Sequence, residues 1–296
     1  MTKQKRPPPP DLRQIRRALL TAVASDDQLF EQLVFKGGNA LELIHKIGER
    51  ASLDLDFSME GDTADAADLE VRLRRAVSDR LDSLGFLVFD WKFGPRPITP
   101  REGFARWGGY RAEFKVIEQD LARSLRDDLD ALRRRSVELG TEHRRVFQMD
   151  ISKFEFCRGS ATVDVDHYRL QVYTPAMIAA EKLRAICQQM PEYAQRLNPA
   201  PRPRDFYDIE AIVASAGVRL GEEQELVRHI FDAKEVPYRL LGLISRDRER
   251  AFHGQVWSVV EQAVRGEVRP FDFYFDFVCA RAEELKPLWE MDPPLG

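Results

Sequence analysis

The stretch Val34-Phe35-Lys36-Gly37-Gly38-Asn39-Ala40-Leu41, followed by Arg50-Ala51-Ser52-Leu53-Asp54-Leu55-Asp56-Phe57-Ser58, decides the fold of this chain. A short apolar run ends at a double glycine, and the next apolar run carries two aspartates one residue apart. The pattern predicts a strand over residues 33–35, a glycine turn, a helix over 39–47 and a second strand over 53–57. The second strand then returns beside the glycines.

Each half of the stretch has its own chemistry. Gly37 and Gly38 can adopt positive φ, and the N–H groups at the start of the following helix point toward an anion such as a triphosphate. In a strand alternate side chains share a face, so Asp54 and Asp56 point together. Paired carboxylates suit Mg²⁺ or Mn²⁺ rather than zinc. Singly, the glycines are typical of a plain turn and the aspartates of a solvated face; their order and separation are more selective.

These motifs together resemble the nucleotidyltransferase superfamily with the polymerase-β-like fold, and within it the AbiEii/AbiGii toxin group. Members of that group have Lys-Gly-Gly-(Thr or Ser)-x-Leu and then Arg-x-Ser-x-Asp-(Ile or Leu)-Asp-Phe. A small hydroxyl residue is usual where this chain has Asn39, whose amide can still contact a phosphate. The matching residues here are Lys36, Gly37, Gly38, Leu41, Arg50, Ser52, Asp54, Asp56 and Phe57.

Two later segments extend the resemblance, which then covers about residue 30 to about residue 215. Residues 181–185, Glu-Lys-Leu-Arg-Ala, resemble a Lys-Leu-x-Ala helix segment of the group, and residues 202–208 resemble its Arg-x-Lys-Asp-x-x-Asp segment. The resemblance implies that Lys182 supplies a cation to a triphosphate and that Asp205 orients it or closes the site. Arg204 replaces the usual lysine, so a point charge becomes a planar fork.

The resemblance implies an α+β fold, in which a polymerase-β-like nucleotidyltransferase core with a small mixed sheet is followed by a helical C-terminal domain. We place the catalytic domain at residues 1–172 and the helical domain, which closes the cleft, at 173–296. A later strand of that fold brings a third acidic residue beside the aspartate pair. Asp150 is the candidate because it lies in the best strand pattern, and Asp164 or Asp166 is the alternative.

Local patterns predict the remaining elements. Strands are expected over 86–89, 110–116 and 146–151. Asp11 is a good N-cap for a first helix, and Thr174 with Pro175 starts another that runs to Ile186. A helix is expected after the prolyl loop 198–203, and several more over 220–292. The helix expected over 65–84 has apolar residues at Ala67, Leu69, Val71, Leu73, Val77 and Leu81.

Composition bounds the class of protein. The chain has 296 residues, and its net charge of −4 creates no global field that attracts nucleic acid. An RNA contact must therefore come from a local patch. Residues 133–135 and 144–145, all arginine, are equally consistent with a docking surface and with a solvated helix face.

Other sequence features favour a cytoplasmic enzyme. The cysteines, Cys157, Cys187 and Cys279, have no metal-binding or disulfide spacing and are interpreted as buried thiols. The N-terminal residues contain no apolar signal segment, and no apolar run of about twenty residues occurs. We therefore expect neither secretion nor a membrane partner.

The implied activity is transfer of a nucleoside monophosphate from an NTP to an acceptor hydroxyl, with release of pyrophosphate. The resemblance implies the 3′ end of tRNA as acceptor, and a growth-inhibiting toxin of a toxin–antitoxin or phage-defence system whose cognate antitoxin is encoded nearby. Two alternatives stay open: an antibiotic-type, small-molecule nucleotidyltransferase, and a noncatalytic module that binds GTP or another NTP.

The implied roles fall into three sets. The metal ligands are Asp54, Asp56 and Asp150. The catalytic set adds Lys182 and Asp205. The nucleotide-binding residues are Lys36, Gly37, Gly38, Asn39, Ser52, Lys182 and Arg204.

Overall fold

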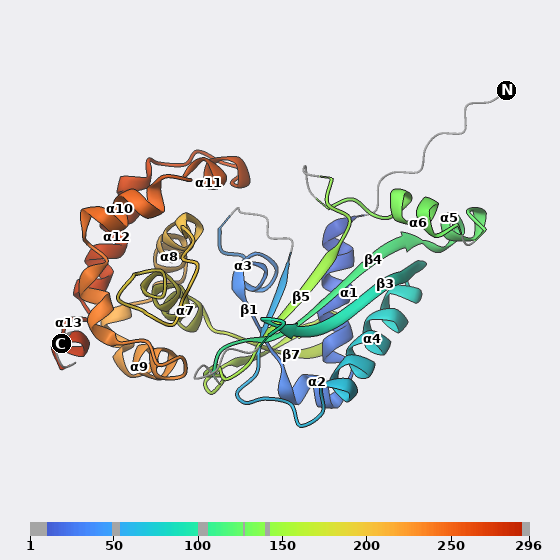
Figure 1. Cartoon of the computed structure of the whole chain (residues 1–296), viewed down its shortest axis with the longest axis horizontal. Helices are drawn as coiled ribbons and strands as arrows, with labels where there is room; N and C mark the ends of the chain where they lie inside the picture. The colour runs from blue at the N-terminus through green and yellow to red at the C-terminus, as the bar shows by residue number, and fades with distance from the viewer. Residues whose placement is uncertain (1–10, 49–53, 100–105, 127, 140–142, 292–296) are drawn as a thin grey trace.

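A computed structural model describes residues 11–48, 54–99, 106–126, 128–139 and 143–291. Figure 1 shows a sheet with its helices, coloured blue to green, beside a helical part coloured yellow to red. The fold class expected from the sequence, a mixed sheet followed by helices, is confirmed. The last strand ends at Val172 and every later element is helical. The division into two domains at this point stays a prediction.

The sheet has seven strands in the order β3-β4-β5-β2-β1-β7-β6. The pairs β2/β5 and β1/β7 are parallel and the other neighbours are antiparallel, which makes the sheet mixed. It is larger than expected from the sequence. The strands are β1 Val34–Lys36, β2 Leu55–Ser58, β3 Phe86–Arg96, β4 Gly109–Glu118, β5 Phe147–Ser152, β6 Ala161–Val165 and β7 Tyr168–Val172.

The hairpin of β6 and β7 was not predicted. Its turn residues Asp166 and His167 both have positive φ, 49° and 69°. A two-residue turn with positive φ at both positions is usually recognised in a sequence by glycine or asparagine, and His167 is neither. Because the usual turn residues are absent, the sequence did not reveal the two strands that form this hairpin.

Helices α1 and α4 pack against each other and against the sheet (Figure 1). Asp11 caps α1 as its sequence predicts, and Asp65 caps α4; each accepts a hydrogen bond from a backbone N–H group of the first turn. Val71, one of the apolar positions expected in α4, is 64% exposed because it lies about 200° around the helix from Leu69. The helices of this part are α1 Leu12–Ala24, α2 Asp27–Gln32, α4 Ala66–Asp82, α5 Gln119–Ser124 and α6 Leu129–Arg135.

The helix after the glycines is irregular and begins earlier than expected. A short α3, Gly37–Asn39, continues as the π-helix η1, Ala40–His45, which ends where Lys46 adopts a left-handed conformation with φ 56°. Segments of π-helix are rare and are often found at functional sites. Residues 49–53 lie outside the described residues, so nothing tests the place of Arg50 in the motif or the nucleotide-binding role expected of Ser52.

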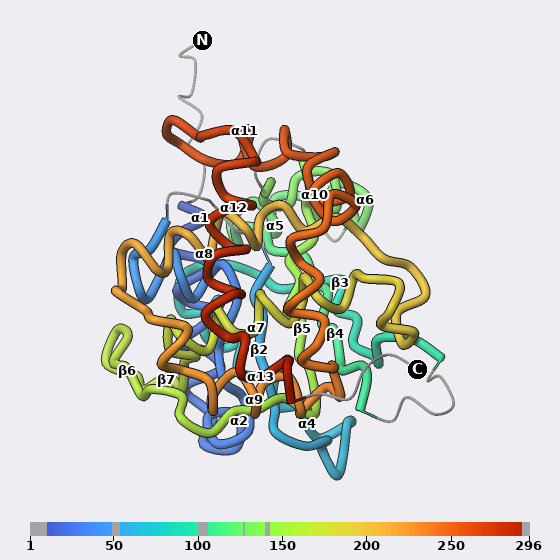
Figure 2. Tube along the Cα trace, turned by 90° about the vertical axis from the view of Figure 1, so that its left-hand side faces the viewer, coloured from blue at the N-terminus to red at the C-terminus, as the bar shows by residue number. Residues whose placement is uncertain are grey.

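The helical part follows β7 and lies nearest the viewer in Figure 2. Thr174 caps α7 by accepting the N–H of Met177 at 3.3 Å, as predicted. No helix in the described part of the chain is long and apolar enough to cross a membrane. The helices are α7 Pro175–Cys187, α8 Pro203–Ala216, α9 Gln224–Asp232, α10 Asp247–Gly254, α11 Ser258–Ala263, α12 Phe271–Glu283 and α13 Lys286–Glu290, with 3₁₀ turns η2 Leu220–Glu222 and η3 Tyr238–Leu243.

The three cysteines are all free thiols, as the sequence indicates. Only Cys187 is fully buried, whereas Cys157 and Cys279 are half-buried, so the interpretation of all three as buried thiols was too strong.

The core beneath the glycine motif fixes the direction of the neighbouring polar residues. Phe35 and Phe57 are fully buried, and their ring centres lie 5.4 Å apart. Because side chains alternate along a strand, Lys36 and Asp56 must point to the opposite face of the sheet. That face is turned toward the helical part.

His253 in α10 is fully buried, and its Nδ1 accepts the backbone N–H of Arg202 at 3.0 Å. Burial lowers the pKa of His253 from 6.5 to about 4, although the charge of Asp205 opposes the shift. As pH falls from 6.5 toward 4, the unfolded chain therefore takes up this proton before the folded chain does.

We expect the free energy of unfolding to decrease by up to about 3 kcal/mol over this pH range from His253 alone. His253→Asn keeps an acceptor near Nδ1 but cannot titrate, so its stability should depend less on pH. Urea denaturation at several pH values measures the difference. His229→Asn, at a half-exposed histidine, is the control; equal pH slopes for the two variants would contradict the assignment.

Candidate functional site

A row of four charged residues crosses the sheet beside the glycine turn. Lys36 on β1 is paired in register with Asp56 on β2, which pairs with Asp150 on β5, which pairs with Arg111 on β4. Residues opposite each other on neighbouring strands share a face. The charged row, as we call these four residues, thus places two carboxylates side by side between two cations.

The row distinguishes the candidates for a third acidic residue. Asp150 is the direct neighbour of Asp56. Asp164 and Asp166 lie on β6 and its turn, separated from β2 by β1 and β7. Asp166 is paired with Arg17 at 2.6 Å. Of the three candidates, the fold brings only Asp150 to the aspartate pair.

Two arginines form ion pairs with the carboxylates of Asp150 and Asp54. Arg111 donates from Nε and Nη2 to the two oxygens of Asp150, at 2.6 and 2.8 Å, and Arg144 donates to Asp54 at 2.5 Å. Arg111 was not predicted as a site residue, and Arg144 belonged to a segment equally consistent with a docking surface and a solvated face. The alternation of Arg111, Glu113 and Lys115 showed a polar face of β4, but only the strand register shows which acid Arg111 meets.

Asp56 is the most perturbed carboxyl group of the row. Burial raises its pKa to about 7; Lys36 opposes the shift, whereas Asp150, Glu181 and Asp54 reinforce it. A half-buried carboxylate that is repelled by its neighbours is a favourable place for a cation.

The residues present fit a hard divalent cation in their chemistry, since all the donors are carboxylate oxygens. Among the residues that the structure describes, no three acidic, histidine or cysteine side chains form a ready-made metal site. Asp54 and Asp150 are turned toward their arginines. Metal ligation by Asp54, Asp56 and Asp150 therefore stays a prediction that requires these pairs to rearrange.

Gly37 is required by its backbone and by its neighbour. It has φ +74°, and a Cβ added there would lie 2.5 Å from Oδ2 of Asp56. Only glycine fits this conformation and this contact without strain. The backbone of Gly37 is thereby held directly against the Asp56 carboxylate.

Asn39 has a different place from the one expected. Its side chain is fully buried, donates to the carbonyl of Asp54 at 2.7 Å and accepts from Arg16 at 3.1 Å. In this arrangement Asn39 supports the backbone that carries the aspartates rather than facing the cavity. Its contact with a phosphate stays a prediction.

The helical part supplies the second wall. Lys182 donates to Asp205 at 2.9 Å and to Asp208 at 2.6 Å, and Arg202 also pairs with Asp205. Burial alone would raise the pKa of Asp205, but the charges of Arg202 and Lys182 outweigh it and lower that pKa. Arg204 is exposed at the cavity. The structure thus brings these predicted residues to the aspartates, with Lys182 already bound to two acids.

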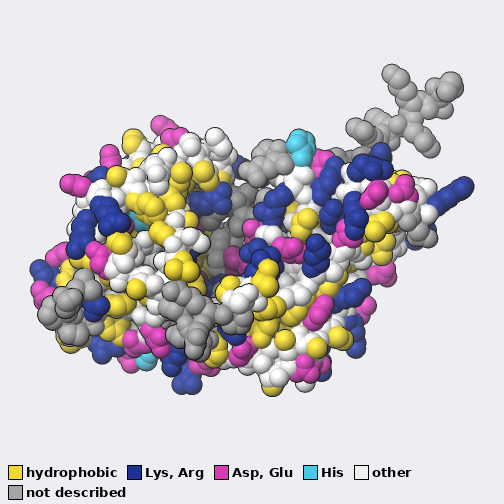
Figure 3. Space-filling model, in the orientation of Figure 1, with side chains coloured by type: hydrophobic (Ala, Val, Ile, Leu, Met, Phe, Trp, Pro, Cys, Tyr) yellow, Lys and Arg dark blue, Asp and Glu magenta, His cyan; other side chains and the backbone are white. Residues whose placement is uncertain are grey.

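A cavity of about 630 Å³ lies between the two walls. Figure 3 shows two lobes with a hollow between them; basic side chains (dark blue) lie at both of its rims, and acidic side chains (magenta) lie at the rim on the right. The lining residues from the sequence motifs are Lys36, Gly37, Gly38, Asp54, Asp56, Asp150, Lys182, Arg204 and Asp205.

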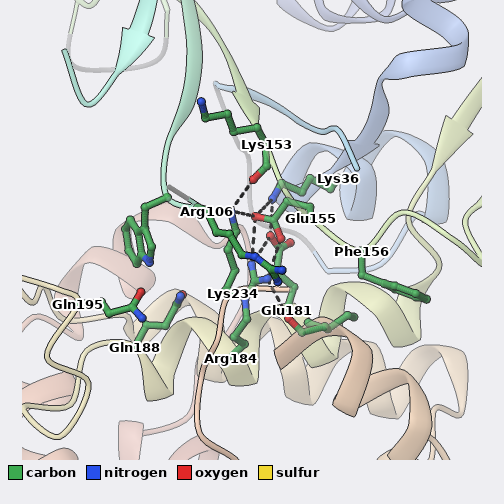
Figure 4. Close-up of polar contacts among 12 residues, drawn as sticks. Lys36, Arg106, Lys153, Glu155, Phe156, Glu181, Arg184, Gln188, Gln195 and Lys234 are labelled. Atoms are coloured by element: carbon green, nitrogen blue, oxygen red, sulfur yellow. Dashed lines mark hydrogen bonds and ion pairs between the residues drawn. The ribbon is translucent and has the colours of Figure 1, made fainter. Parts of the chain in front are cut away.

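A buried ionic cluster joins the sheet to the helical part (Figure 4). Glu155 is 4% exposed and lies 2.7 Å from Arg184, 3.6 Å from Lys36 and 3.5 Å from Lys234. Lys36 also donates to Glu181. Burial lowers the pKa of Lys234 to about 8, and Glu155 opposes that shift. We call these five residues the ionic cluster: Lys36, Glu155, Glu181, Arg184 and Lys234. The ionic cluster fixes Lys36, the cation at one end of the charged row.

Removing the charge of Glu155 should be costly because three cations would remain beside one acid. We expect Glu155→Gln to reduce the free energy of unfolding by about 3–5 kcal/mol. The double variant Glu155→Gln/Lys234→Met restores the charge balance and should recover part of that loss. Chemical denaturation measures both.

The matched control is Glu60→Gln, at an exposed carboxylate paired with Arg158. An exposed pair contributes about 1 kcal/mol or less, so this variant should stay near wild type. A Glu155→Gln variant as stable as the control would show that the ionic cluster does not hold the two parts together.

Comparison with known proteins agrees with this geometry. The family model described as "Nucleotidyl transferase AbiEii toxin, Type IV TA system" matches residues 18–276. No curated protein matches the chain. The family model covers most of the chain, whereas the similar solved structures are distant in sequence.

Two of those structures come from Helicobacter pylori. JHP933 is 15% identical, with 94% of this chain and 91% of that chain covered and a TM-score of 0.48. A protein titled as a candidate nucleotidyltransferase is also 15% identical, with 96% and 97% covered and a TM-score of 0.47. The assignment therefore rests on the family model: this chain belongs to the AbiEii family of nucleotidyltransferase toxins of type IV toxin–antitoxin systems.

Proposed function

We propose that this nucleotidyltransferase transfers a nucleoside monophosphate from an NTP to the 3′-terminal hydroxyl of an RNA, with tRNA as the acceptor. The observation that carries the proposal is the pair Asp56 and Asp150, side by side in a cavity that also contains the glycine turn. As a family toxin it would act on RNA in the cytoplasm and be neutralised by its antitoxin.

Different residues of the site would serve different parts of the reaction. Asp54, Asp56 and Asp150 would hold Mg²⁺ or Mn²⁺, and the bound metal supplies Lewis-acid stabilisation of charge on the phosphates. Backbone N–H groups of Gly37 and Gly38 bind the phosphates of the NTP. The acceptor hydroxyl would lose its proton to a carboxylate of the site while its oxygen forms a bond to the α-phosphorus; the bond from that phosphorus to the β-phosphate oxygen breaks, and pyrophosphate leaves with the electron pair.

The cations of the cavity favour a highly charged leaving group. Lys36, Lys182 and Arg204 line it, and pyrophosphate carries several negative charges. Lys182 lies between Asp205 and Asp208 and would approach the triphosphate from the helical wall. Asp205 then orients Lys182, which is one of the two roles that the family pattern implies for it, the other being to close the site.

The arginine-rich segment of α6 is a weak candidate for RNA docking. Arg133 forms two hydrogen bonds with Asp90, at 2.7 and 2.9 Å, and Arg145 pairs with Glu138. Arg144 is held by Asp54. Ion pairs inside the protein occupy these three guanidinium groups, which favours the interpretation as a solvated face.

The test is incubation of the protein with Mg²⁺, each labelled NTP in turn and total bacterial RNA. Label should appear in the tRNA band, and Asp56→Asn should reduce transfer by about a thousandfold because it removes a metal ligand at the reacting phosphate. Asp164→Asn, on β6, is the control and should keep wild-type activity. Label in a small acceptor instead of RNA would favour the antibiotic-type alternative, and no transfer at all would favour the binding module.

Gly37 offers a second test with a matched control. Gly37→Ala adds a Cβ against the Asp56 carboxylate, whereas Gly85 has φ +80° and nothing within 4 Å of an added Cβ. Both variants should lose about 1–2 kcal/mol of stability from positive φ. Only Gly37→Ala should also lose about a hundredfold in transfer rate, because its Cβ would displace the Asp56 carboxylate from its position in the site. Equal rates in the two variants would show that the contact does not matter.

A further inference from the structure

A second cavity, of about 540 Å³, adjoins the first. The two share Lys36, Asp56 and Asp150. The first cavity contains the glycine turn, whereas the second extends along the charged row past Arg111 toward Trp107. A transfer reaction brings two substrates together at one set of carboxylates, and two cavities that meet at Asp56 and Asp150 meet this requirement.

The far wall of the second cavity carries a fixed aromatic ring. The indole N–H of Trp107 donates to the hydroxyl of Tyr193 at 2.9 Å. That hydroxyl is buried and lies 3.1 Å from both the side-chain oxygen of Gln195 and the carbonyl of Lys234. The Trp107 ring is therefore held in place by a buried hydrogen-bond network.

Lys234 fixes the backbone of the same wall (Figure 4). Its ammonium group donates to the carbonyl of Arg106 at 3.1 Å and to that of Lys153 at 2.6 Å, and it lies beside Glu155 of the ionic cluster. The residue next to Trp107 is thus tied to the group that holds Lys36. These contacts fix the position of this wall of the second cavity relative to the charged row.

Arg196 is a cation of this cavity that can meet an anion. Its guanidinium group lies 5.9 Å from the centre of the Trp107 ring and donates from Nε to the carbonyl of Asn198 at 3.4 Å, and among the described residues no carboxylate forms an ion pair with it. Burial lowers the pKa of Arg196, and the nearby positive charge of Arg202 lowers it further. A guanidinium group in this environment is stabilised most by a charge-assisted ion pair with a phosphate.

Aromatic rings and guanidinium planes together are characteristic of sites for single-stranded RNA, whose bases stack while its phosphates form ion pairs. We infer that the second cavity binds the 3′-terminal nucleotides of the acceptor RNA, with a base stacked on Trp107 and a phosphate paired with Arg196. The terminal hydroxyl then reaches the carboxylates from the side opposite the glycine turn. This assignment rests on the proposed function, because it supplies the acceptor for the same reaction.

The experiment measures RNA and NTP separately. Binding of a short single-stranded RNA with a free 3′-hydroxyl and a 5′ fluorescent label is followed by anisotropy, and NTP binding by equilibrium dialysis. Trp107→Ala should weaken RNA binding, and raise the KM for RNA, by about tenfold, while NTP affinity stays unchanged. Trp107→Phe keeps a ring and should recover most of the affinity; thermal unfolding confirms that the variants are folded.

The charge is tested in the same way. Arg196→Ala should weaken RNA binding several-fold and reduce its salt dependence, whereas Arg158→Ala, at an exposed arginine outside both cavities, should change neither. Unchanged RNA affinity in folded Trp107→Ala and Arg196→Ala, or an equal loss of NTP affinity, overturns the inference.

The outcomes for the inference and for the proposed function differ. RNA binding that depends on Trp107 without any nucleotide transfer supports the RNA site and overturns the proposed reaction. Transfer to RNA that is unaffected by either variant supports the reaction and overturns this site. If RNA is neither bound nor modified, both are overturned.

Discussion

The repulsion between Asp56 and Asp150 is the constraint on which the rest of this structure depends. Neighbouring strands place the two carboxylates side by side, and burial raises the pKa of Asp56 to about 7 with Asp150 reinforcing the shift. Lys36 and Arg111 flank them on the adjoining strands, so the charged row alternates from a cation through two acids to a cation. Buried phenylalanines on the opposite face keep the row directed at the cavity.

Lys36 connects this row to the helical part. Its ammonium group is buried and paired with Glu181 on α7, while Glu155 links it to Arg184 and Lys234. Buried ion pairs stabilise little compared with apolar packing, but they impose strict geometry because an unpaired buried charge is strongly unfavourable. The ionic cluster therefore has a consequence for function: it sets where the helical wall stands relative to the aspartates.

Local rules predicted much of this fold. The caps at Asp11 and Thr174 and the alternation around Asp56 were predicted, since each depends on residues only a few positions apart. The hairpin of β6 and β7 was missed because its turn lacks the usual glycine. The hydrogen bonds of Asn39 to Arg16 and to the Asp54 carbonyl were not predicted, because these partners are distant in sequence.

The sequence by itself determined the family resemblance, the paired aspartates and the glycine turn, and it offered Asp150 as the first of three candidates for the acid beside them. Their spacing reflects local backbone geometry, which short patterns encode. Only the tertiary structure decided that Arg111 meets Asp150, that Lys182 lies between Asp205 and Asp208, and that Trp107 lines a second cavity. These contacts depend on strand register and on packing between distant segments, and a small shift in either would pair different residues from the same sequence.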